Sequence, residues 1–189
     1  MKNKINFLTI LILFISLLVT PIVSEGKIIK CKSSPINLSN FKFLKKKKIE
    51  KWSNCFGEID YGYGERYYGE FQNGKYHGQG VYVFGGKKGT YGGHRRGTTY
   101  KGQFLDGNRE GIGIIIWMDG DKYEGQFKKN KYHGRGTITF SLKNPGTFKH
   151  GWKIWTGEFK NGALDGKGKK INLKGEITEG IFEKGELKK

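Results

Sequence analysis

Beyond its first two dozen residues, this 189-residue chain lacks any long hydrophobic run, and histidine, cysteine and proline are all rare. A transmembrane helix needs about 20 mostly apolar residues, so no later segment qualifies as one. The two cysteines are 24 residues apart with no histidine nearby, which argues against a metal site. Acidic residues are also outnumbered, 17 against 35 Lys and Arg, so the chain attracts anionic surfaces.

Signatures of catalysis are missing too. No serine or cysteine lies in a nucleophile motif, and no glycine-rich phosphate loop leads from a strand into a helix. The sequence therefore predicts no catalytic residue, no metal ligand and no cofactor. What it has in abundance is glycine, 31 residues, and aromatic residues, 14% of the chain. This pairing favours short strands joined by tight turns, because glycine costs a helix about 1 kcal/mol relative to alanine.

The N-terminal run is typical of an export signal. Lys2 and Lys4 precede an apolar stretch over residues 7–23, and small residues follow it. We therefore predict a signal peptide over residues 1–24 and an exported protein, periplasmic or secreted. The alternative is a membrane anchor through residues 5–23 that is not cleaved. Removal of the signal leaves a net charge of 33 − 17 = +16.

A motif of the form aromatic-x-Gly-x-Phe recurs along the rest of the chain. It begins at Tyr67, Tyr100, Tyr123 and Trp155, with a degenerate copy at Thr178. The steps are 33, 23, 32 and 23 residues, so the basic unit has 23 residues and two copies carry insertions. A fixed period of this kind indicates repeat architecture. The residues assigned to the repeat scaffold are Tyr67, Gly69, Phe71, Gly74, Gly78, Gly80, Tyr100, Gly102, Phe104, Gly107, Gly111, Gly113, Tyr123, Gly125, Phe127, Asn130, Gly134, Gly136, Trp155, Gly157, Phe159, Gly162, Gly166 and Gly168.

Each slot of the repeat has a physical reason. Tyr67, Gly69 and Phe71 alternate with polar residues, which is the pattern of a strand with one buried face. The slot of Gly74 holds only Gly or Asn, the residues that adopt positive φ most readily in a tight turn. β-branched and aromatic residues follow each Gly-x-Gly pair and predict a second strand. The glycines of that strand are expected to leave room for the rings of neighbouring copies.

The repeating unit is thus a β-hairpin, and stacked hairpins build an extended sheet in which each repeat touches its neighbours. We predict an all-β fold, an elongated single-layer antiparallel sheet of about five stacked hairpins over residues 54–189. A signal helix precedes it. Since a single layer cannot hide both faces, the aromatic-rich face is expected to form an open groove.

The pattern Y-x-G-E-F-x-x-G-x-x-H-G-x-G at this period resembles the MORN repeat (membrane occupation and recognition nexus), over roughly residues 52–187. The segment Trp-x-Asn-Cys-Phe-Gly that begins at Trp52 is similar to that of exported bacterial members. The resemblance implies contact with proteins or membrane lipids, and it implies no reaction.

His77 and His133 occupy a slot that holds Glu110 and Asp165 in other copies. A slot filled by His, Glu or Asp beside a glycine turn is expected to form local hydrogen bonds rather than to bind a metal. The repeated motif is therefore interpreted as scaffold.

Clustered cations lie in two insertions and in the segment after the signal. The insertions cover residues 85–99 and 141–154 and are expected at the same edge of the sheet, while residues 25–53 are predicted to be a disordered basic arm. We predict that these clusters contact an anionic lipid or envelope surface, and the alternative is that they are simply solvated. The candidate contact residues are Lys45, Lys46, Lys47, Lys48, Lys87, Lys88, Arg95, Arg96, Lys149 and Lys153.

An even pair of cysteines in an exported chain predicts one disulfide, here between Cys31 and Cys55. The alternative is two unrelated free thiols. The disulfide would tie the basic arm to the start of the repeats.

The predicted function is a non-enzymatic scaffold or binding module outside the cytoplasm that contacts proteins or anionic membrane surfaces. Export disfavours a nucleic-acid partner, and no small-molecule substrate is indicated. The alternative is a glycan-binding envelope protein, or an enzyme, that uses an open aromatic groove. Burial of Tyr82, Trp117 and Phe140 would favour the scaffold, and their exposure would favour glycan binding.

Overall fold

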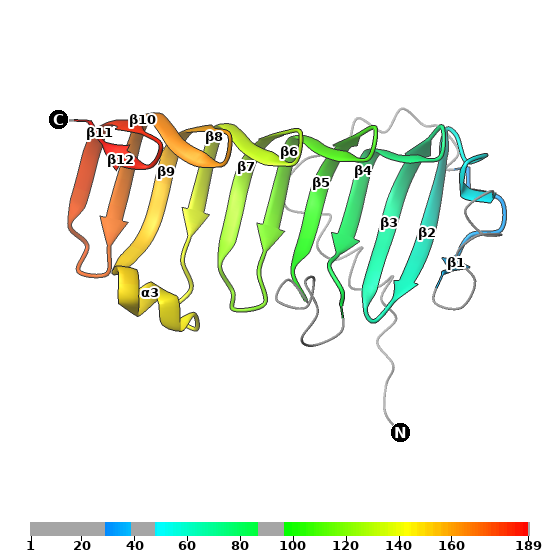
Figure 1. The fold of residues 1–189 in the computed structure, drawn as a ribbon, viewed down its shortest axis with the longest axis horizontal. Coiled ribbons are helices and arrows are strands. Elements are labelled where there is room, and N and C mark those ends of the chain that lie inside the picture. Colours follow the sequence, from blue (N-terminus) through cyan, green and yellow to red (C-terminus); the bar gives the residue numbers. More distant parts are fainter. Residues whose placement is uncertain (1–28, 39–47, 87–96, 189) are drawn as a thin grey trace, which may run out of the picture.

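The computed structural model describes residues 29–38, 48–86 and 97–188, and the predicted signal helix lies outside them. The described residues form one open sheet of 12 strands that lie side by side in chain order (Figure 1). Neighbouring strands are antiparallel, except that β1 runs parallel to β2. The strands are β1 (Ile36–Asn37), β2 (Cys55–Gly62), β3 (Glu65–Gln72), β4 (Lys75–Val83), β5 (Thr99–Leu105), β6 (Asn108–Ile116), β7 (Lys122–Lys128), β8 (Lys131–Thr139), β9 (Trp152–Lys160), β10 (Ala163–Asn172), β11 (Ile177–Glu183) and β12 (Glu186–Leu187).

The predicted stack of about five hairpins is confirmed. The hairpins are β3–β4, β5–β6, β7–β8, β9–β10 and β11–β12. Their five turns share one long edge of the sheet, which we call the tip edge (Figure 1). The connections between hairpins share the opposite edge, the loop edge, together with the short helix α3 (Pro145–His150). Both predicted insertions connect hairpins, so both leave from the loop edge as expected.

Two consecutive residues at each tip have positive φ, which is the type I′ geometry of two-residue hairpin loops. In the first hairpin they are Asn73 (φ 49°) and Gly74 (φ 72°), so the conformation predicted for the Gly74 slot is confirmed. In the third and fifth hairpins a lysine, Lys129 or Lys184, takes the first of the two positions. The geometry of the tip is therefore kept even where the residue is not one that favours positive φ.

Each of the last four tips is tied to the hairpin before it by a backbone hydrogen bond, while the Gly74 amide of the first tip donates to the Trp52 carbonyl oxygen. The donor is the amide of the second turn residue, and the acceptor is a carbonyl oxygen at the start of the preceding hairpin's second strand. The pairs are Gly107 to Tyr76 (2.9 Å), Asn130 to Arg109 (3.0 Å), Gly162 to Tyr132 (3.0 Å) and Gly185 to Leu164 (2.8 Å).

Ten glycines lie side by side across the sheet, one in each strand from β2 to β11. They form a floor for the tyrosine rings of the repeats. A Cβ atom added to Gly113 would lie 2.5 Å from the ring of Tyr100, and a hydrogen bond of 2.7 Å from the Tyr100 hydroxyl to the Gln103 carbonyl oxygen fixes that ring. The ring leans along its own strand onto the glycines of its own hairpin. The expectation that the glycines make room for rings of neighbouring copies is therefore wrong.

A second side chain covers each tyrosine ring from the other side. Tyr76 stacks on Tyr67 with 3.7 Å between ring centroids, and the third hairpin repeats this stack at 3.8 Å. In the second hairpin Arg109 is the cover, with its guanidinium carbon 5.7 Å from the Tyr100 centroid. Tyr67, Tyr100 and Tyr123 consequently have no exposed surface, although the sheet has only one layer. The rings gain cation–π or stacking contacts in addition to burial.

Part of the segment predicted to be a disordered arm is ordered. In residues 29–38 and 48–53, Cys31, Ile36 and Trp52 are buried against β2 and the first hairpin. Apolar residues lie between the lysines of this segment and cover the outer edge of β2. Burial of those side chains offsets the entropy lost when the segment is ordered.

The predicted Cys31–Cys55 disulfide is present and joins this N-terminal segment to the first residue of β2. Trp52 packs edge to face on Phe71, with 4.8 Å between ring centroids, and its Nε1 donates a hydrogen bond of 2.8 Å to the Lys32 carbonyl oxygen. We call residues 29–38 and 48–53 the N-terminal cap. Within the described ranges, no helix has the length and hydropathy to cross a membrane.

Candidate binding surfaces

Half-buried aromatic side chains line the face of the sheet that holds the buried tyrosines. They include Tyr61, Tyr76, Tyr82, Phe84, Trp117 and Tyr132. At the N-terminal end of this face lies a cavity of about 200 Å³ lined by Ile49, Ile59, Tyr61, Gly74, Lys75, Tyr76 and Gly107. The repeated tyrosines are thus closed off, and what remains accessible on this face is the layer that covers them.

Tyr82, Trp117 and Phe140 are all half-buried. They are neither fully buried, as expected for a scaffold, nor fully exposed, as expected for a glycan-binding groove. Each one packs against another ring. The partner rings are those of Phe84, Tyr132 and Trp155, at centroid distances of 4.8, 6.4 and 5.1 Å. A ring that packs on its neighbour has less free surface to stack on a sugar, so this packing favours the scaffold.

Phenol groups pair near the cavity. The hydroxyls of Tyr61 and Tyr76 share a hydrogen bond, and Tyr82 donates one to the Glu65 carboxylate. Burial raises the pKa of Tyr76, and burial together with Glu65 raises the pKa of Tyr82. These phenols stay protonated at neutral pH, so they form hydrogen bonds and do not act as bases.

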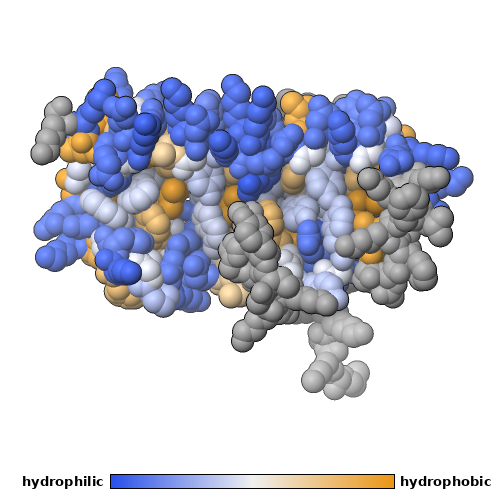
Figure 2. Space-filling view, viewed as in Figure 1, coloured by the Kyte–Doolittle hydropathy of each residue, from blue (hydrophilic) through white to orange (hydrophobic). Residues whose placement is uncertain are grey.

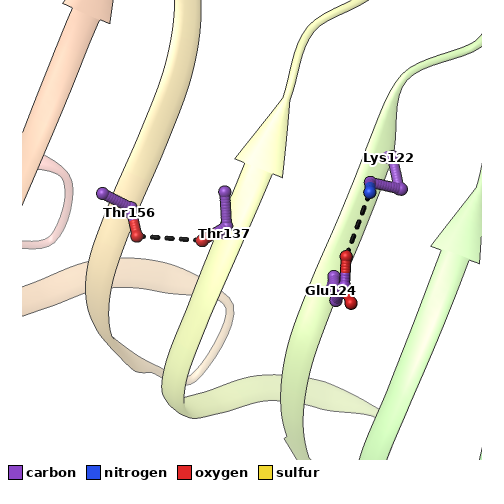
Figure 3. A network of polar contacts seen from close by, with 4 residues as sticks. All are labelled: Lys122, Glu124, Thr137 and Thr156. Atoms are coloured by element: carbon purple, nitrogen blue, oxygen red, sulfur yellow. Dashed lines mark hydrogen bonds and ion pairs between the residues drawn. The ribbon is translucent and has the colours of Figure 1, made fainter. Parts of the chain in front are cut away.

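The opposite face of the sheet is polar where β7, β8 and β9 lie together (Figure 3). Lys122 Nζ lies 3.0 Å from a carboxylate oxygen of Glu124, and the Thr137 and Thr156 hydroxyls share a hydrogen bond of 2.9 Å. Exposed ion pairs contribute about 0–1 kcal/mol, so the Lys122–Glu124 pair stabilises the sheet little. These contacts give this face its polar character without building a site.

The slot shared by His77, His133, Glu110 and Asp165 does form local hydrogen bonds where it holds an acid. The Glu110 carboxylate accepts one of 2.9 Å from the Lys129 amide. The Asp165 carboxylate accepts one of 3.1 Å from the Lys184 amide, in the tip of the last hairpin. His77 Nδ1 is buried and forms no hydrogen bond within the described part of the chain. Within the same ranges, no group of three His, Cys, Asp or Glu side chains is placed to hold a metal ion.

The structure locates only three of the cations proposed for anion contact. Lys45, Lys46, Lys47, Lys87, Lys88, Arg95 and Arg96 lie outside the described residues. Lys48 is exposed in the N-terminal cap, whereas Lys149 and Lys153 are exposed in and beside α3, near the far end of the sheet. These three do not come together in one site.

A further cation, Lys170, was not predicted as a site residue and lies almost buried in β10. Its Nζ is 4.3 Å from the Trp155 ring centroid and within 5.4 Å of the rings of Trp152 and Phe182, and it donates a hydrogen bond to the Gly185 carbonyl oxygen. Burial lowers the pKa of this amine, while the rings and the carbonyl favour its charged form. Lys170 fills this aromatic box itself, so the box is part of the packing.

The insertion between β8 and β9 forms an ordered structure around the short helix α3. Asn144 caps helix α3 by accepting a hydrogen bond of 2.9 Å from the Gly146 amide, and Pro145 is the first helical residue. Gly151 ends the helix in the left-handed conformation. The sequence contained this signal as Asn-Pro followed by Gly, which marks a short helix.

Comparison with known proteins identifies the repeats. The family model of the MORN repeat matches residues 67–86, 100–122, 123–141 and 155–171, which begin at the four predicted aromatic starts. Alsin of Homo sapiens, of Pan troglodytes and of Mus musculus are each 31% identical to this chain over 86 residues. That match covers 46% of this chain but only 5% of alsin. The chain carries four MORN repeats, which form the hairpins β3–β4, β5–β6, β7–β8 and β9–β10.

Proposed function

We propose that this protein is a non-enzymatic binding module that acts outside the cytoplasm and contacts an anionic membrane surface, as a member of the exported bacterial MORN-repeat proteins. The observation that carries the proposal is the burial of Tyr67, Tyr100 and Tyr123. Because the repeated tyrosine rings are buried in the packing of the hairpins, the repeats act as a stiff support. Contact with a partner is then made by the remaining surface and by the edges of the sheet.

Net charge supports an anionic partner. The form without residues 1–24 carries 33 basic and 17 acidic residues. Charges on a long sheet act weakly beyond a Debye length of about 8 Å at physiological salt, so clustered cations count more than scattered ones. A protein partner with an acidic surface fits the same charge and is the other outcome of the test below.

The test is co-sedimentation with lipid vesicles across a salt series, for vesicles with and without anionic lipid. We expect binding that requires anionic lipid and weakens as salt increases, because each lysine near such a surface contributes about 1 kcal/mol. Replacement of Lys45–Lys48 by glutamine, or of Arg95 and Arg96, should weaken binding clearly.

Scattered cations provide the matched control. Replacement of the same number of them, such as Lys128 and Lys169, should change binding much less. If the clustered and the scattered replacements weaken vesicle binding equally, net charge alone explains the binding. Binding that ignores both salt and lipid charge would contradict the membrane proposal and leave a protein or glycan partner as the better explanation.

A further inference from the structure

Large apolar side chains are exposed on the loop edge beside α3. Met118, in the turn between β6 and β7, is 77% exposed, and Leu142 and Phe148 in the neighbouring insertion are 61% and 64% exposed. The two connections are adjacent, since a Cβ atom on Gly120 would lie 2.7 Å from the Ser141 hydroxyl. Met118, Leu142 and Phe148 therefore lie exposed on two adjacent connections of the loop edge.

The insertion holds its apolar side chains outward by means of a polar interior. The Asp121 carboxylate accepts hydrogen bonds of 2.7 Å from the Ser141 amide and from the Asn144 side-chain amide. Thr147 is fully buried and donates a hydrogen bond of 2.7 Å to the Ser141 carbonyl oxygen. A flexible loop would be free to turn a phenylalanine toward the protein, whereas this insertion is fixed with Phe148 in solvent.

The far end of the insertion is fixed as well. The Gly151 amide donates a hydrogen bond of 2.8 Å to the Thr147 carbonyl oxygen, and the Gly151 carbonyl oxygen accepts one of 2.8 Å from Leu173 in the next connection. Figure 1 shows α3 projecting at the loop edge beyond the strands that flank it. This projecting part of the described edge is thus held by hydrogen bonds and carries exposed apolar side chains.

Charge indicates what this edge contacts. Residues 141–154 contain Lys143, Lys149 and Lys153 and no acidic residue. All three lysines are exposed, while the Asp121 carboxylate is engaged inside the insertion. Apolar side chains flanked by lysines are the arrangement found where proteins enter the interface of an anionic bilayer, with the lysines reaching the headgroups.

We propose that the sheet stands with its loop edge on the membrane, so that Met118, Leu142 and Phe148 enter the interfacial layer of an anionic bilayer. The inference rests on the proposed function and adds the edge, the side chains and the orientation. The polar tip edge, which carries hydrophilic side chains along its length in Figure 2, then faces away from the membrane.

The test uses the form without residues 1–24, which contains every described residue, and vesicles of phosphatidylcholine with phosphatidylglycerol. Leu142→Ser together with Phe148→Ser should weaken vesicle binding at least about tenfold, because the inserted apolar area is lost. Leu105→Ser is the matched control, since Leu105 is 48% exposed at the tip edge, and it should leave binding unchanged. Circular dichroism establishes that each variant is folded.

A second readout reports depth. Phe148→Trp should give tryptophan fluorescence that shifts to the blue on vesicle binding and is quenched by brominated lipid, relative to the wild-type protein with its four tryptophans. Leu105→Trp should show neither effect. If the wild-type protein binds vesicles but the serine pair binds equally well, or if both tryptophan variants are quenched alike, the orientation is wrong and the proposed function stands. If the wild-type protein does not bind anionic vesicles, the proposed function is contradicted as well.

Discussion

A tyrosine between glycine and a second aromatic or cationic side chain is the smallest stabilising unit of this protein. The Tyr100 ring lies flat on two glycines, which have no side chain beneath it, and its hydroxyl therefore reaches the Gln103 carbonyl oxygen. Gly113 lacks positive φ, so it is required for space and not for backbone freedom. Gly107, at the tip, has φ 84° and open space around it, so glycine is required there for backbone freedom and not for space.

These two glycines give a paired prediction. Gly113→Ala should lower the free energy of unfolding by about 2–3 kcal/mol, as overpacking does, and Gly107→Ala by about 1 kcal/mol, the cost of its positive φ. Chemical denaturation measures both. Combining Gly113→Ala with Tyr100→Leu should reduce the cost of the alanine, because the ring that it meets is gone. Equal costs for the two alanine variants would contradict the role of Gly113 as ring floor.

At the scale of whole elements, the hairpins could be predicted from the sequence and the N-terminal cap could not. The hairpins follow from local rules that repeat, such as the alternation from Tyr67 to Phe71 and the turn at Gly74, so each copy supports the others. The cap occurs once and has no period. Its order depends on the packing of Trp52 and Ile36 against β2 and the first hairpin. Such contacts between separate segments leave no local pattern in the sequence.

The candidate site was predictable to the same uneven degree. The lysines of the second insertion were identified from composition, but the ordered α3 and the outward direction of Phe148 depend on Asp121, which lies 27 residues earlier in the chain. The aromatic face was predicted correctly as a face. The closure of this face was not predicted, because Tyr76 and Arg109 cover rings that belong to the other strand of their hairpin.

The cap supplies a prediction about the disulfide. Replacing Cys31 and Cys55 by serine should destabilise the cap by up to about 3 kcal/mol, the chain-entropy value for a loop of this size. In a repeat protein such a loss stays largely local, so the cap should become sensitive to protease while the hairpins remain resistant. Limited proteolysis followed by mass spectrometry locates the cuts, and the intact protein should gain the mass of two hydrogens on reduction. Unchanged resistance of the N-terminal cap in the serine variant would show that the disulfide is dispensable.

Considered as a whole, the described part of the molecule has several of its tyrosines in or packed against one continuous core. Burial, their largest common cause, raises the pKa of Tyr67, Tyr76, Tyr82, Tyr100 and Tyr123. An unfolded tyrosine loses its proton near pH 10, while these five keep theirs in the folded state. Their stabilising effect is complete below that pH and is lost as the pH rises above it, since the unfolded chain then binds fewer protons.

We therefore expect the free energy of unfolding to fall steeply above about pH 10, with each such tyrosine contributing about 1.4 kcal/mol per pH unit. Urea denaturation from pH 8 to pH 11 measures this slope. Tyr100→Phe should make the slope shallower by one tyrosine while it lowers stability at neutral pH through the lost hydrogen bond. A slope that is unchanged in this variant would mean that Tyr100 ionises as freely in the folded protein as in the unfolded chain.

The order of the strands has a consequence for how this molecule is made. Every strand from β2 onward pairs only with its neighbours in the chain, so no segment waits for a partner that is synthesised much later. Contacts of such short range are formed quickly, and few unpaired edges are exposed meanwhile. A chain that emerges N-terminus first, from a ribosome or a translocation pore, can thus close its cap onto β2 and then add one hairpin after another. At each moment only the newest strand presents an open edge.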